Sequence, residues 1–143
     1  MDKHYNRTKY APMAKIKNHV YIGFYPEHEV GGLLKIGETE QEMKKRAQGI
    51  KSHAKEDFKV LLYVEYETPH RWAKTSRVEV ESYVRYRLAR RNNKLHWIDS
   101  KNDHFYYNIE TQEIDEWVRQ FRKYVKVSLK HQHIKTYQFK TLE

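Results

Sequence analysis

The sequence predicts an α+β fold in which a small, mainly antiparallel sheet of three strands is flanked by helices. Apolar stretches at 19–25 and 33–38 are separated by a short glycine-containing turn, which predicts a β-hairpin. A third stretch, 58–68, alternates in polarity and is rich in Val, Leu and Tyr, so we expect it to join the same sheet. Helical periodicity follows the second and third strands. A chain of 143 residues is the usual size of a single domain.

The segment before the first strand, residues 1–18, mixes Lys, Arg, Asn and Thr and shows no period. We interpret it as an arm. The first strand is expected to end near Pro26. The following turn spans Glu27–Gly32, whose two glycines suit positive φ angles.

A helix is predicted to open on Thr39, directly after the second strand. Thr39 and Glu42 have the spacing of a capping box, in which the two residues satisfy each other's backbone N–H groups. Three apolar residues then fall on one side of the helix, namely Met43, Ala47 and Ile50. Arg46 lies at the edge of this stripe, so we expect it near the hairpin.

Two more helices are predicted in the second half of the chain. Residues 72–91 form the longest helical pattern, with a buried seam of Val80, Val84 and Leu88. Short apolar or aromatic pieces at 95–98 and 104–109 surround a polar loop. Residues 113–125 predict the last helix, whose inward positions are Ile114, Trp117, Val118 and Phe121. The residues from 126 onward suit either a short strand or a basic tail.

Composition narrows the classes of function. The formal charge of +9 and the pI near 9.6 attract polyanions, with nucleic acid as the first candidate. The absence of cysteine excludes disulfides, thiolate zinc sites and cysteine nucleophiles, so a metal would need oxygen or imidazole ligands. No run is long enough for a membrane-spanning helix and the N-terminus lacks a signal-peptide pattern. We expect a cytoplasmic protein without a membrane partner.

The hairpin and the helix after it resemble the GIY-YIG nuclease superfamily, in the branch whose second motif is Lys-Ile-Gly-x-Thr. This branch is often named for a phage T5 open reading frame. Val20-Tyr21-Ile22 stands for the first motif, 35–39 for the second, and Arg46 for the helix arginine. The resemblance continues to Glu81 and, more loosely, to 104–106. It implies a GIY-YIG-like nuclease domain at 19–126, between the arm at 1–18 and a basic C-terminal tail at 127–143.

This resemblance implies a divalent-metal-dependent DNA endonuclease that hydrolyses phosphodiester bonds. Glu81 would bind a single Mg²⁺ or Mn²⁺ ion, Arg46 would stabilise the phosphate, and Tyr21 and Lys35 would lie near the attacking water. Better-known members have tyrosine where this chain has Lys35, so this lysine either holds phosphate or acts as a base. The branch also tends to show Glu-x-x-x-His, where this chain has Arg85.

Further residues are expected to support binding. Lys44, Lys45 and Arg85 are candidates for nonspecific phosphate contacts, with double-stranded DNA as the expected partner. His53, His104 and Asn108 are further candidates. They rank below the others because histidines and asparagines at such positions are usually solvated or structural. The sequence leaves open whether the protein forms a homodimer.

Spacing alone leaves alternatives open. Glu79 flanks the helix seam as Glu81 does, and Arg77 and Arg85 lie four residues on either side of Glu81, as in a surface salt-bridge ladder. The runner-up function is a noncatalytic nucleic-acid-binding domain on the same scaffold. A third hypothesis is a different nuclease fold with carboxylates at Asp57, Glu65 and Glu67. Glycine-rich phosphate loops and nucleophile elbows are absent from the sequence.

Overall fold

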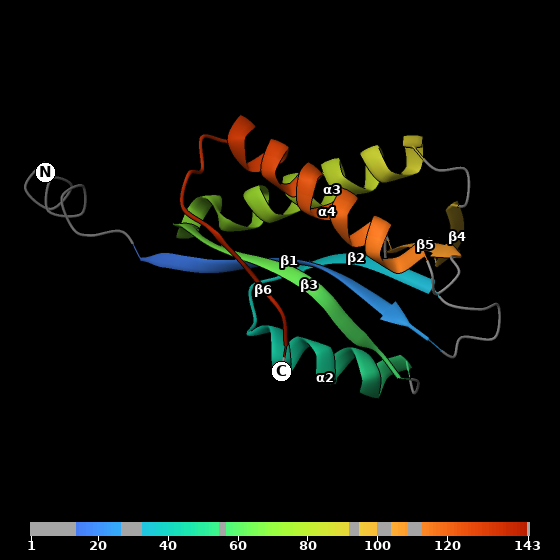
Figure 1. Ribbon diagram of the computed structural model, residues 1–143. Coiled ribbons are helices and arrows are strands. Elements are labelled where there is room, and N and C mark those ends of the chain that lie inside the picture. Colours follow the sequence, from blue (N-terminus) through green and yellow to red (C-terminus); the bar gives the residue numbers. More distant parts are fainter. Residues whose placement is uncertain are drawn as a thin grey trace, which may run out of the picture.

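The computed structural model describes residues 14–26, 33–54, 57–91, 95–99, 104–108 and 113–142. Within these ranges, strands form one antiparallel sheet in the order β4-β5-β2-β1-β3-β6 (Figure 1). The strands are β1 (Lys15–Tyr25), β2 (Leu33–Thr39), β3 (Lys59–Pro69), β4 (Leu95–Asp99), β5 (His104–Asn108) and β6 (Gln138–Lys140). The predicted α+β class is confirmed.

Helices cover both faces of the sheet. Helix α2 (Met43–Ala54) lies on one face, while α3 (His70–Arg91) and α4 (Ile114–His131) lie side by side on the other (Figure 1). Alternation along β1 directs Val20 and Ile22 toward α3 and α4, and Tyr21 toward α2. The sheet therefore separates two apolar layers.

The predicted apolar stripes are buried as expected. On the α2 side, Met43, Ala47 and Ile50 pack with Tyr21 and other residues of the sheet. On the opposite side, the α3 seam is completely buried against α4 and the sheet, with Val80, Val84 and Leu88 all at 0% exposure. Burial of these side chains is the main stabilising contribution of each helix.

Several boundaries differ from the predictions. The predicted three strands form the centre of the sheet, but β5 and β4 extend it beyond β2, and β6 extends it beyond β3. The first strand begins at Lys15, within the predicted arm. The last helix continues to His131 and β6 follows it. Of the two alternatives left open for the residues after 126, a short strand is present. The predicted turn at 27–32 lies outside the described residues.

The capping box predicted at Thr39 was wrong. Thr39 is the last residue of β2, and the helix begins four residues later at Met43. The Thr39 Oγ1 accepts a hydrogen bond from the Gln41 backbone N–H at 3.0 Å. The hydroxyl therefore stabilises the turn between strand and helix, which is the local alternative that Thr side chains offer to capping.

Candidate functional site

An open edge of β2 forms the centre of the candidate site. Within the described residues, the paired positions of β5 and β2 end at Lys35, so residues 36–39 of β2 have no paired strand on that side. Residues 36–39 belong to the Lys-Ile-Gly-x-Thr motif. Helix α3 packs across β1 and β2 next to this edge. Side chains from both faces of the sheet can therefore meet at the edge.

Gly37 makes room for Tyr21. The two residues are direct cross-strand neighbours of β1 and β2, and a Cβ at Gly37 would lie 2.3 Å from the Tyr21 hydroxyl oxygen. Because Gly37 has no side chain, the tyrosine ring lies over β2 and brings its hydroxyl toward the open edge. The glycine of the second motif and the tyrosine of the first motif thus require each other sterically.

The Tyr21 hydroxyl is buried among charged groups. Burial raises its pKa to about 12, the Arg46 guanidinium opposes this shift through its positive charge and through hydrogen bonding, and the charges of Glu81 and Glu38 add to it. These groups come from α2, α3 and β2, although α2 and α3 cover opposite faces of the sheet. The approach of Arg46 to this hydroxyl falls short of full hydrogen-bond geometry, and within the described part of the chain neither Tyr21 Oη nor the buried Arg46 Nε has a partner with good geometry. Buried polar atoms of this kind are rare and point to a ligand or an ordered water.

Glu81 is a largely buried carboxylate on α3. Its side chain is 13% exposed, and Arg85 Nη2 lies 3.3 Å from its Oε1 with an exposure of 11%. The pair is therefore not a solvated surface ladder. Glu79, the alternative that spacing left open, is exposed on the outer side of the same helix.

Arg77 is a structural residue of the site that the sequence analysis treated as a surface charge. It is 6% exposed, and its Nη1 donates a hydrogen bond to Asn18 Oδ1 at 3.0 Å. Its Nε donates to Glu38 Oε1 at 3.3 Å, which holds the Glu38 carboxylate at the end of β2. The sequence feature that could have predicted this burial is helical spacing, because Arg77 lies three residues before Val80 and seven before Val84, on the same side of the helix.

Lys35 is buried on β2, at 3% exposure, on the same face of the sheet as Gly37 and Tyr21. Its direct neighbours are Gly23 on β1 and Tyr106 on β5. Gly23 on the adjacent strand and Gly37 on the same strand leave space for the lysine side chain on this face of the sheet. The lysine of the motif is therefore part of the same region as Tyr21.

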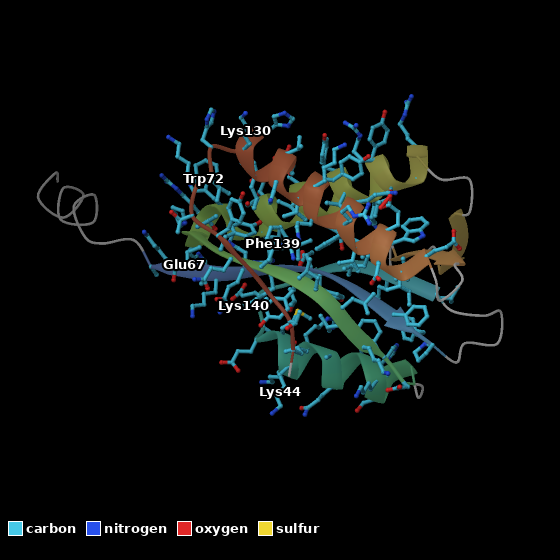
Figure 2. The ribbon with its side chains drawn as sticks, viewed as in Figure 1. Lys44, Glu67, Trp72, Lys130, Phe139 and Lys140 are labelled. Carbon is cyan, nitrogen blue, oxygen red and sulfur yellow. The ribbon has the colours of Figure 1, made fainter. Side chains whose placement is uncertain are left out.

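The other candidate residues are more dispersed. Lys44 and Lys45 are exposed on α2, and Figure 2 shows Lys44 directed away from the sheet. His53 is exposed in the last turn of α2. His104 and Asn108 begin and end β5, and their side chains lie outside the described part of the structure.

A second polar network, which the sequence analysis did not predict, lies on β1, β3 and β6. His19 is buried, and its Nε2 is 3.0 Å from Glu65 Oε2, while Lys140 Nζ donates to Glu65 Oε1 at 2.7 Å. Burial raises the pKa of Glu65, but the hydrogen bonds from Lys140 and His19 outweigh it and hold that pKa below the ordinary value of 4.5. Glu65 is therefore an ion-pair residue.

The hypothesis of a carboxylate cluster receives no support from this arrangement. Glu67 and Asp57 are both exposed, and Asp57 lies 3.9 Å from Lys51. Among the residues that the structure describes, no three His, Cys, Asp or Glu side chains come close enough together to hold a metal ion. A metal ion held by these described residues would be bound by one or two carboxylates together with water and substrate.

The fold is that of a small α+β domain in which the two motifs meet at one edge of the sheet. The T5orf172 domain model matches residues 18–122, most of the chain, and the chain belongs to this family. The family is related to nuclease-type domains of the GIY-YIG and HNH kinds and is associated with candidate endonucleases. Comparison with curated proteins and with solved structures found no match. No helix in the described ranges combines the length and the apolar character needed to cross a membrane.

Proposed function

We propose that this protein is a divalent-metal-dependent DNA endonuclease whose active site lies at the open edge of β2. The observation that carries the proposal is the buried Tyr21 hydroxyl, on which Arg46, Glu81 and Glu38 all act electrostatically. Phosphodiester hydrolysis needs a positioned water and positive charge on the phosphate as negative charge develops. A buried titratable group with a shifted pKa beside several charged side chains is typical of catalytic sites.

The residues fit one Mg²⁺ or Mn²⁺ ion. Mg²⁺ commonly keeps several waters and is held by one or two carboxylates together with substrate phosphate, so a full cluster of protein ligands is not needed. Glu81 would hold the ion, which when bound would supply positive charge to the phosphate. The orphaned Tyr21 Oη and Arg46 Nε fit a site completed by polar ligands, because a buried polar atom without a partner costs about 1–3 kcal/mol.

Each protein residue has a distinct role in the proposal. The planar Arg46 guanidinium donates hydrogen bonds to a nonbridging phosphate oxygen, a task that suits arginine better than lysine. Tyr21, with its pKa raised to about 12, keeps its proton near neutral pH and orients the attacking water by hydrogen bonding. Lys35 holds phosphate from the same face of the sheet. Lys44, Lys45 and Arg85 add nonspecific contacts to duplex DNA.

The second candidate function is a noncatalytic nucleic-acid-binding domain. The ion pair between Arg85 and Glu81 at 3.3 Å favours it, because the guanidinium occupies a carboxylate oxygen that a metal ion would need. The basic surface would then bind phosphates without hydrolysis.

A plasmid-nicking assay with added Mg²⁺ or Mn²⁺ tests the proposal. We expect the wild-type protein to cleave and Glu81→Gln and Arg46→Ala to lose roughly 100-fold or more in rate. Glu79→Gln is the matched control, since it makes the same change on the exposed side of α3 and should retain cleavage. Duplex binding, measured by fluorescence anisotropy, should survive Glu81→Gln. Binding without cleavage by the wild-type protein would favour the second candidate.

A further inference from the structure

The outer groove between α3 and α4 combines arginines with tyrosine rings. A cleft of about 480 Å³ there is lined, among the residues that the structure describes, by Tyr86, Arg87, Arg90 and Tyr124. None of these four is acidic. The helices around the cleft are strongly basic, since α3 carries seven Arg or Lys against two Glu, and α4 carries five against one Asp and one Glu.

The arginines are held over the tyrosine rings. The Arg87 guanidinium lies 4.9 Å from the Tyr124 ring centroid, and the Arg90 guanidinium lies 5.6 Å from that of Tyr86. The same two arginines donate hydrogen bonds of 3.0 Å to the hydroxyls of Tyr83 and Tyr86. Tyr86 nevertheless leaves 55% of its surface exposed, the largest exposed fraction among the described large hydrophobic residues.

The cleft is separate from the edge site. The charge of Glu81 on α3 acts on Tyr21 at the edge site, whereas Tyr86 and Arg90 lie roughly 140° and 180° around the helix axis from Glu81. We propose that this α3–α4 cleft binds single-stranded nucleic acid, with Tyr86 stacking on a base and Arg87 and Arg90 contacting phosphates. Basic grooves with exposed aromatic rings are the usual means of binding single strands, because every base offers a ring face. The assignment does not depend on catalysis at the edge site.

The chain provides a matched control for Tyr86 on the same helix. Trp72 is 54% exposed and has the Arg71 guanidinium 5.3 Å from its ring, but it does not line the cleft. Figure 2 shows Trp72 near the N-terminal end of α3. Substitution of either ring leaves the formal charge unchanged, so a difference between the two variants reports on the cleft and not on the overall field.

The test is fluorescence anisotropy of the full chain with a labelled oligothymidylate in EDTA, so that cleavage plays no part. Tyr86→Ala should weaken single-strand binding roughly tenfold, and Trp72→Ala should leave it within about twofold. Arg90→Ala should weaken binding and reduce the slope of log K against log salt by about 0.7. Circular dichroism melts should show that all variants remain folded.

Three outcomes would overturn the assignment. The first is equal loss in the Tyr86 and Trp72 variants, and the second is no loss in the Tyr86 variant. The third is competition by polyglutamate as effective as that by unlabelled oligothymidylate, which would show that the cleft recognises negative charge alone. A protein that fails to cleave plasmid but passes this test would contradict the proposed endonuclease while supporting the cleft.

Discussion

At the scale of single residues, the site depends on a buried tyrosine hydroxyl that Arg46 approaches but that has no well-formed hydrogen bond among the described residues. Such a group destabilises the folded protein, so its presence suits a role that is completed only when substrate arrives. The sequence identified Tyr21, Lys35 and Gly37 as parts of two motifs, because motif spacing is visible in the chain. It could not predict that the Gly37 backbone accommodates the Tyr21 ring, because strand register decides that contact.

Tyr21→Phe removes this hydroxyl and keeps the ring. We expect the free energy of unfolding to rise by up to about 1 kcal/mol, since an unsatisfied buried polar atom is lost, and cleavage to fall roughly 100-fold. Tyr66→Phe is the matched control. Tyr66 is also buried with a pKa raised to about 12, but its hydroxyl is 3.0 Å from Ser76 Oγ. That variant should lose about 1 kcal/mol and retain cleavage in urea titrations and nicking assays.

At the scale of elements, apolar periodicity predicted the three central strands and the core-facing stripes of all three helices, because burial follows directly from the alternation of residues. Arg77 was misinterpreted since a charge on a helix usually marks an exposed face. In this fold, Asn18 and Glu38 together satisfy its guanidinium beneath the helix. Arg77 thereby joins α3 to β1 and β2 and fixes the helix that carries Glu81.

Arg77→Met should therefore destabilise the protein more than the same substitution at an exposed helix arginine. We expect the free energy of unfolding to fall by about 3 kcal/mol. This is at the lower end of the range for breaking a buried ion pair, because Glu38 is 20% exposed. Arg71→Met, an exposed arginine at the start of the same helix, should change stability by less than about 0.5 kcal/mol. Chemical denaturation measures both, and equal effects would show that the buried network contributes little.

At the scale of the whole molecule, the C-terminal residues complete the sheet. Strand β6 pairs with β3, and Lys140 contacts Glu65, which also contacts His19 on β1. The sequence left this segment open between strand and tail, since three residues carry too little periodicity to decide. That Arg46 and Glu81 serve one site was implied by the family resemblance, but periodicity alone could not show that their charges act on Tyr21 from opposite faces of the sheet.

The Glu65 network predicts a pH dependence of stability. The pKa of Glu65 is held below 4.5 in the folded protein, so its stabilising contribution is present above the unfolded value and is lost as pH falls below 4.5 through the folded value. At pH 7 the wild-type protein should have a higher melting temperature than the Glu65→Gln variant, and this difference in melting temperature should shrink between pH 5 and 3. A constant difference across this range, measured by thermal melts, would contradict the ion-pair interpretation.

We propose that Arg46 and Glu81 act together on one phosphate at the open edge of β2. A double-mutant cycle in cleavage rate tests it most directly, using Arg46→Ala, Glu81→Gln and the combined variant under saturating Mg²⁺. Because residues that work as one unit show non-additive effects, the combined variant should be scarcely slower than either single variant. If the rate losses of the two single variants multiply in the combined variant, or if the single variants cleave at the wild-type rate, Arg46 and Glu81 do not act together on one phosphate.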